Sequence, residues 1–189
     1  RGAATITDRI LPLAETFLSQ LPRSPRVGGA ALSVYHQGVP VVDIWSGLAK
    51  KDGTPWEADT LSLSYSTTKG VLSTLAHMLV DRGQLNYDHP IAHYWPAFAQ
   101  GGKHAITLRH VMTHESGLYH IRQMIKDARE MLDWPHMLEV MEKAVPYHAP
   151  GERIGYHALT YGWIVGGLIE KVTGEPLAVT LKRMIADPL

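Results

Sequence analysis

The tetrapeptide Ser66-Thr67-Thr68-Lys69 stands where the short run Leu61 to Tyr65 gives way to a predicted helix over Thr67 to Arg82. Three residues span nearly one helical turn, so we expect the Ser66 hydroxyl and the Lys69 amine to lie in contact on one face. A desolvated lysine can take the proton of a serine hydroxyl, and a helix N-terminus favours the charge of a developing oxyanion. Taken alone, the tetrapeptide fits a helix-capping serine and a solvated lysine at least as well.

The residues before this tetrapeptide predict a helix and a β-hairpin. Apolar residues at helical spacing predict a helix from Ile6 to Leu21, which Pro12 should kink or shorten near its start. Two apolar runs, Gly28 to His36 and Val39 to Trp45, are joined by Gln37-Gly38 and predict the hairpin.

The residues after Gly83 predict short helices separated by long loops. Thr107 is the expected N-cap of a helix over Leu108 to Met112, because its hydroxyl can accept from an otherwise unpaired N–H. The last two helices are expected from Ala158 to Thr173 and from Pro176 to Ile185.

The order of these elements predicts an α/β (α+β) fold with an incomplete sheet. A two-stranded hairpin is marginal alone, and no convincing strand follows Tyr65. We therefore expect residues 1–65 to form the helix and hairpin of an antiparallel sheet domain that these residues do not complete. Residues 66–189 should form a mainly helical region.

Composition excludes several classes of protein. The 189 residues suit one domain, and 18 Lys and Arg balance 18 Asp and Glu, so no basic field exists for nucleic acid or anionic lipid. Apolar stretches such as Trp163 to Ile169 fall short of the roughly 18 to 20 residues that span a bilayer. The absence of cysteine excludes disulfides and thiolate chemistry. No signal-peptide pattern is present; the compartment stays open, with cytoplasm favoured over periplasm.

Several motifs in a fixed order resemble the serine β-lactamase and penicillin-binding-protein superfamily, specifically its esterase-like, class C-related branch that includes family VIII carboxylesterases. The likeness runs from the hairpin to the end of the chain. The matching segments are Ser66 to Lys69, Leu85 to Pro90, Ile106 to Leu118 (with Val111-Met112 for a paired leucine), Pro150-Gly151-Glu152, Tyr156-His157-Ala158, Tyr161 to Glu170 and Val172-Thr173-Gly174.

The resemblance assigns a role to each matching residue. Ser66 would be the acyl-accepting nucleophile, Lys69 its activating partner and Tyr156 a second general base or acid. A phenol beside an ammonium has its phenolate stabilised, which suits proton transfer. His157, next to Tyr156, would add polarity for the substrate unless it is a surface residue. The resemblance implies no metal and no cofactor.

Two departures from the family pattern bear on the substrate. Ala158 takes the place of an asparagine that would hold a β-lactam side-chain amide, and Asn86, the one asparagine of the chain, lies in a turn expected to be structural. Simple esters should therefore fit better than penicillins. A K-T-G, H-x-G or W-x-G motif, which in the family supplies a sheet strand and a second oxyanion donor, is absent from the 189 residues.

Other signals are weaker. His89/His93 and His110/His114 have the spacing of paired zinc ligands on a helix, but neither forms H-E-x-x-H and no third ligand is indicated, so solvated, capping or structural roles are preferred. Gly101-Gly102-Lys103 lacks the pattern of a phosphate loop and is expected to be loop. No G-x-S-x-G elbow is present.

The leading hypothesis is a serine hydrolase that cleaves small acyl esters through an acyl-Ser66 intermediate. The alternative is a catalytically silent domain or fragment that binds a partner, in which the open sheet edge pairs with a second copy or with a complementing C-terminal segment. A β-lactamase or D-Ala-D-Ala peptidase is the third alternative. Neither nucleic acid nor a membrane is an expected partner.

Overall fold

The computed structural model describes residues 11, 12, 14–16, 19 and 28–189. It divides the chain into two compact units, Arg1–Leu63 and Ser64–Leu189, which are described separately below. The predicted helix from Ile6 to Leu21 lies largely outside the described residues. Those of its residues that are described, Leu11, Pro12, 14–16 and Ser19, are helical.

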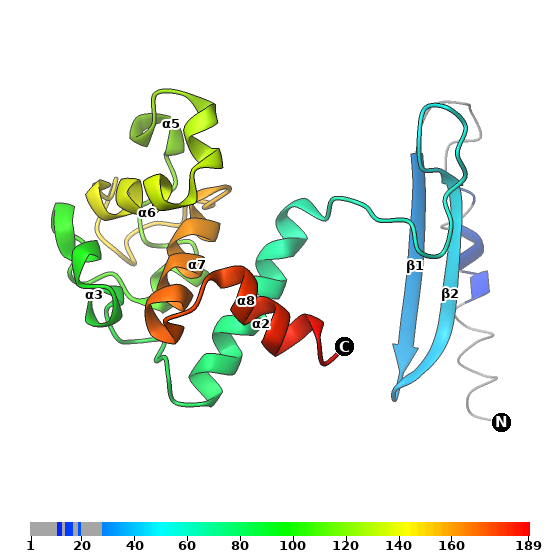
Figure 1. Cartoon of the computed structure of the whole chain (residues 1–189), viewed down its shortest axis with the longest axis horizontal. Coiled ribbons are helices and arrows are strands. Elements are labelled where there is room, and N and C mark those ends of the chain that lie inside the picture. The colour runs from blue at the N-terminus through cyan, green and yellow to red at the C-terminus, as the bar shows by residue number, and fades with distance from the viewer. Residues whose placement is uncertain (1–10, 13, 17–18, 20–27) are drawn as a thin grey trace. The chain divides into compact units, whose positions relative to one another are not determined.

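The first unit contains the predicted hairpin (Figure 1), whose strands β1 (Gly28–His36) and β2 (Val39–Leu48) pair antiparallel. The two residues that join them, Gln37 and Gly38, both have positive φ angles, of 52° and 78°. This is the geometry of a type I′ turn, whose twist matches that of the strands it connects. The hairpin prediction is confirmed, and β2 runs three residues beyond the expected Trp45.

The short run from Leu61 to Tyr65 forms no strand among the described residues. Residues 61–64 have no regular structure, and Tyr65 already begins a short 3₁₀ turn, η1 (Tyr65–Thr67). Tyr65 has a positive φ of 43°, so the chain turns sharply immediately before Ser66.

The second unit is helical (Figure 1), as predicted. Its helices after η1 are α2 (Thr68–Asp81), α3 (Ile91–Tyr94), η2 (Pro96–Gly102), α4 (Leu108–Met112), α5 (Ile121–Met124), η3 (Ala128–Leu132), α6 (Trp134–Lys143), α7 (Thr160–Thr173), α8 (Leu177–Leu181) and the π-helical turn η4 (Lys182–Ala186). The predicted helix over Thr67 to Arg82 is α2, and the helix expected from Ala158 begins at Thr160. Thr107 caps α4 as predicted, since its hydroxyl accepts from the N–H of His110.

The core of this unit forms around α7, which contacts α2, α3, α4, α6 and α8. Eight of its fourteen residues are buried, which explains its nearly continuous apolar sequence. Two glycines let neighbouring rings approach its backbone. A methyl group at Gly166 would lie 2.8 Å from Trp134, and one at Gly167 would lie 2.9 Å from Trp95. Close packing of this kind fills the interior at the density that folded proteins require.

Lys103 is fully buried, although its position after two glycines predicts a solvated loop. Its ammonium donates to the carbonyl oxygens of Gln100 (2.6 Å), Glu142 (2.8 Å) and Ala144. Burial lowers the pKa of Lys103 to about 8. The three carbonyls match the three N–H bonds of the charged form, so Lys103 fastens η2 to the end of α6.

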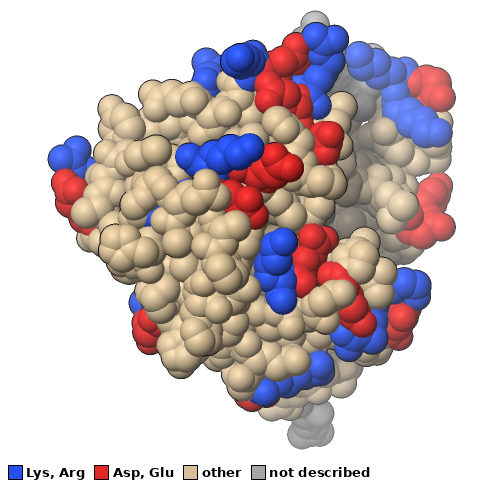
Figure 2. All heavy atoms as spheres, turned by 60° about the vertical axis from the view of Figure 1, so that its left-hand side comes forward, with Lys and Arg blue, Asp and Glu red and all other residues tan. Residues whose placement is uncertain are grey.

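Charges are dispersed over the described surface. Figure 2 shows lysine, arginine and carboxylate side chains interspersed among uncharged residues on the face that it displays. Among the described residues, no helix combines the length and apolar character needed to cross a bilayer.

Candidate active site

The start of α2 brings Ser66 and Lys69 together as their spacing predicts. Ser66 lies in the turn η1 that leads into α2, and the Nζ atom of Lys69 donates to Ser66 Oγ at 3.3 Å. Lys69 also donates to the carbonyl oxygen of Ala158 at 2.7 Å. The second bond ties the beginning of α2 to the segment that precedes α7.

Tyr156 completes this cluster from a distant part of the sequence. The Nζ atom of Lys69 lies 5.1 Å from the centroid of the Tyr156 ring. A hydrogen bond from Ser66 lowers the pKa of the Tyr156 phenol, and the neighbouring Lys69 lowers it further, whereas partial desolvation opposes both effects. Lower pKa values bring a phenol closer to the range in which it accepts protons at neutral pH.

Helices α2 and α7 are in contact at Ser73, one helical turn after Lys69 along α2. The hydroxyl of Ser73 donates to the carbonyl oxygen of Lys69 at 2.7 Å and lies 2.6 Å from the hydroxyl of Tyr161. Burial raises the pKa of Tyr161. Tyr161 is therefore a neutral structural phenol, whereas Tyr156, beside Lys69, is exposed.

His157, which was expected either to add polarity for the substrate or to lie at the surface, does not lie at the surface. Its side chain is fully buried, Nδ1 lies 2.7 Å from the carbonyl oxygen of Gly155, and Nε2 lies 2.5 Å from the hydroxyl of Ser116. Since a carbonyl only accepts, Nδ1 carries the proton and Nε2 accepts from Ser116. Burial lowers the pKa of His157 to about 4, so the ring is neutral. Local sequence offers no signal for this burial, because a histidine beside an exposed tyrosine can point to either face.

His114 was expected to be structural and proves to lie next to the cluster. Its ring packs edge-on against the Tyr156 ring, with centroids 4.8 Å apart. No group of three or more metal-ligating side chains occurs among the described residues, which include His89, His93, His110 and His114. Asn86 forms a structural turn, in which its side-chain oxygen accepts from the N–H of Asp88.

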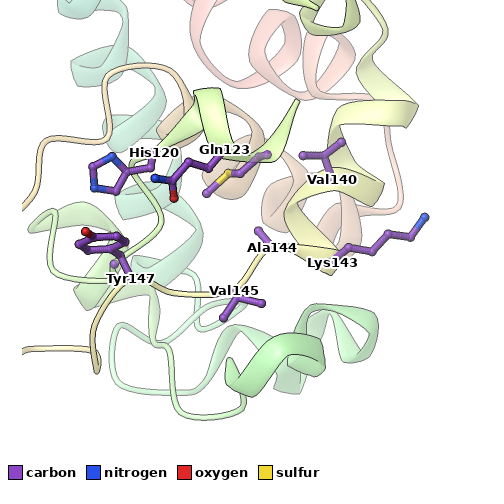
Figure 3. A pocket seen from close by; sticks show the side chains of 9 residues that line it. His120, Gln123, Val140, Lys143, Ala144, Val145 and Tyr147 are labelled. Atoms are coloured by element: carbon purple, nitrogen blue, oxygen red, sulfur yellow. The ribbon is translucent and has the colours of Figure 1, made fainter. Parts of the chain in front are cut away.

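Two cavities in the second unit are lined by residues other than Ser66, Lys69 and Tyr156. One of about 350 Å³ (Figure 3) lies between α5, α6 and the segment that follows α6, and is lined by residues that include His120, Gln123 and Tyr147; neither Ser66, Lys69 nor Tyr156 lines it. The other, of about 480 Å³, includes Leu159, the residue after Ala158. Its apolar lining comes from Ile121, Ile125, Ala128, Met131 and Leu159.

Comparison with known families decides the relationship. The family model described as Beta-lactamase matches residues 14–189, which is nearly the whole chain. The chain belongs to the beta-lactamase family. The expected resemblance is confirmed, and with it the β-lactamase-like fold class.

Relatives within the beta-lactamase family include esterases. The chain is 41% identical over 182 residues to the esterase/beta-lactamase LipL of Mycobacterium tuberculosis, covering 96% of this chain and 42% of that protein. A penicillin-binding protein homologue from Caulobacter crescentus matches 96% of this chain and 49% of its own, with a TM-score of 0.88 and 33% identity. A family VIII carboxylesterase matches all of this chain and 50% of its own, with a TM-score of 0.83 and 29% identity. The chain thus spans about half the length of these beta-lactamase family members.

Proposed function

We propose that the protein is a serine hydrolase that cleaves small carboxylic esters through an acyl-Ser66 intermediate. The observation that carries this proposal is the contact of Lys69 Nζ with Ser66 Oγ at 3.3 Å, beside the ring of Tyr156. The proposal is supported by two similar proteins whose names describe them as an esterase/beta-lactamase and a carboxylesterase.

The roles of Lys69 and Tyr156 differ in this arrangement. Lys69 donates to two acceptors, Ser66 Oγ and the Ala158 carbonyl, which suits the charged ammonium. Tyr156, whose pKa is lowered by its bond to Ser66 and by Lys69, is then the better-placed acceptor of the Ser66 proton.

The reaction follows from these roles. As Ser66 Oγ bonds to the ester carbonyl carbon, its proton passes to Tyr156, and the N–H groups at the start of α2 favour the negative charge on the carbonyl oxygen. Tyr156 then protonates the leaving alkoxide as the ester C–O bond breaks. In the second half, Tyr156 takes a proton from water as the water oxygen bonds to the acyl carbon. Tyr156 then returns this proton to Ser66 Oγ as the bond between Oγ and the acyl carbon breaks, which releases the acid and restores Ser66.

Simple esters fit the surroundings better than β-lactams. The side chain of Ala158 offers no hydrogen bond to a substrate amide, and its carbonyl oxygen is occupied by Lys69.

The test uses the full protein, an ester and a phosphonate. We expect hydrolysis of p-nitrophenyl butyrate, and a mass increase on Ser66 after p-nitrophenyl phosphonate treatment, as Ser66 Oγ displaces p-nitrophenolate from phosphorus. Ser66→Ala should abolish both the hydrolysis and the phosphonate adduct. Ser64, an exposed serine two residues earlier, provides the control, and Ser64→Ala should retain both. Turnover that survives in Ser66→Ala would overturn the proposal. Faster hydrolysis of nitrocefin or a D-Ala-D-Ala peptide than of the ester would overturn the ester preference.

The silent binding domain stays as the second candidate because of the hairpin. Within the described residues, β1 pairs only with β2, while the end of β2 also forms a bridge from Leu48 to Pro55 and accepts the N–H of Trp56 at the Gly47 carbonyl. The remaining backbone edges are open to another segment or chain. Light scattering would show a dimer or larger assembly if a second copy pairs there. An inactive protein without a Ser66 adduct would favour this candidate.

A further inference from the structure

His114 occupies a backbone position that normally belongs to glycine. It has a φ of +66° and directly follows the C-cap of α4. Its N–H donates to the carbonyl oxygen of Val111 at 3.1 Å, and the N–H of Glu115 donates to that of His110 at 2.6 Å. These two bonds define a Schellman motif, in which the left-handed residue is usually glycine because a Cβ atom is disfavoured there. A histidine at this position therefore destabilises the fold relative to glycine. We expect contacts of its side chain to compensate for that cost.

The side chain and the carbonyl of His114 hold the segment that carries Tyr156. That segment has no helix or strand, so no regular ladder of hydrogen bonds fixes it. The N–H of Gly155 donates to the His114 carbonyl oxygen at 2.8 Å, and the N–H of His157 donates to His114 Nδ1 at 3.1 Å. The residues on both sides of Tyr156 are therefore bound to the same residue.

The ring of His114 also contacts the phenol itself. The His114 and Tyr156 rings meet edge to face at 4.8 Å, and Tyr156 is otherwise 52% exposed. Lys69 Nζ lies 5.1 Å from the same phenol ring. A half-exposed side chain on an irregular segment needs such packing to keep one orientation.

The protonation state of His114 suits this contact. Nδ1 accepts a hydrogen bond from a backbone N–H, so it carries no proton of its own. Burial lowers the pKa of His114, and the positive charge of Lys69 lowers it further, which keeps that nitrogen free to accept.

We propose that His114 is a positioning residue for Tyr156, fixing the backbone on both sides of the phenol and packing against its ring beside Ser66 and Lys69. This inference rests on the proposed function to the extent that Tyr156 transfers protons there. Sequence spacing alone does not reveal it, because the two residues are far apart in the chain.

Two substitutions in the full protein separate positioning from folding. His114→Gly keeps the left-handed turn without strain and removes the ring and the acceptor. His114→Asn tolerates the same φ and presents Oδ1 in place of Nδ1. We expect kcat/KM for p-nitrophenyl butyrate to fall about 100-fold in His114→Gly, as for a small misplacement of a catalytic group, and to recover to within about tenfold of the unmodified protein in His114→Asn. Both variants should show the circular dichroism spectrum of the folded protein.

A second measurement does not depend on turnover. Tyrosine labelled with ¹³C at Cζ reports the titration of each phenol by NMR, and the Tyr156 signal is the one lost in Tyr156→Phe. The Tyr156 midpoint should rise in His114→Gly and stay in place in His114→Asn. An unchanged midpoint, or unchanged kcat/KM, in His114→Gly would overturn the positioning role. Absence of ester hydrolysis by the unmodified protein would instead overturn the proposed function, and the NMR titration would then decide the role of His114 alone.

Discussion

Acid should destabilise this protein through His157, a neutral imidazole that unfolding would expose to water. The side chain is fully buried, and its two nitrogens are engaged by Ser116 and Gly155 in the neutral form. Burial lowers the pKa of His157 to about 4, against an ordinary value near 6.5. Between those two values the unfolded chain binds a proton that the folded chain does not.

The magnitude follows from the two pKa values. Because the folded pKa is the lower one, the contribution of His157 to stability is complete above pH 6.5 and is lost as the pH falls toward 4. A difference of about 2.5 units at about 1.36 kcal/mol each gives a maximum loss of about 3.4 kcal/mol. At pH 5 the same relation gives a loss of about 2 kcal/mol, a large fraction of the stability of a typical domain.

Urea unfolding followed by tryptophan fluorescence between pH 7.5 and pH 4.5 measures this loss. Carboxylates also titrate near the lower end of this range, so the decisive quantity is the difference between the unmodified protein and His157→Gln. The variant should be less stable at pH 7.5 but should lose about 2 kcal/mol less on acidification to pH 5. The exposed His104, substituted His104→Gln, is the control and should follow the unmodified protein. Parallel pH dependence in the unmodified protein and His157→Gln would refute the reasoning.

Two further pairs of variants test the packing around the site. Gly155→Ala would place a methyl carbon 2.1 Å from the ring of Tyr119. We therefore expect the free energy of unfolding in urea to fall by about 1–3 kcal/mol and ester hydrolysis to slow. At Gly162 the described residues leave room for the methyl group, so Gly162→Ala should raise the free energy of unfolding by up to about 1 kcal/mol. Equal stability of these two variants would contradict the crowding at residue 155. Lys103→Met should cost about 3 kcal/mol because it leaves buried carbonyls unpaired, whereas Lys143→Met on the exposed face of α6 should cost less than about 0.5 kcal/mol by the same measurement. A small effect at Lys103 would show that water replaces its ammonium.

The elements that short-range rules govern could be predicted from the sequence. The hairpin follows from two apolar runs around Gln37-Gly38, and the capped start of α4 follows from the hydroxyl of Thr107. The contact of Ser66 with Lys69 follows from helical periodicity alone. The last two features depend on residues within about one helical turn of each other, and the hairpin depends on a two-residue turn between adjacent segments.

Features that depend on tertiary packing could not be predicted in this way. The burial of Lys103 requires carbonyl oxygens that belong to η2 and α6. The two glycines before Lys103 give no indication that its side chain is buried. The orientation of His157 depends on Ser116, forty-one positions earlier in the chain. Tyr156 was assigned through the order of family motifs, because nothing in its neighbouring residues predicts the approach of Lys69.

The two halves of the candidate site therefore rest on different kinds of support. Ser66 and Lys69 are fixed by the continuous backbone of η1 and the first turn of α2, so their separation should survive most changes elsewhere. Tyr156 stands on an irregular segment, and its place depends on single contacts: the bond from Lys69 to the Ala158 carbonyl, and those of its neighbours to His114. Substitutions that alter the proton-transfer step without touching Ser66 or Lys69 should therefore concentrate around Tyr156. Because each such contact also sets the environment of the phenol, they should change the pH dependence of turnover together with its rate.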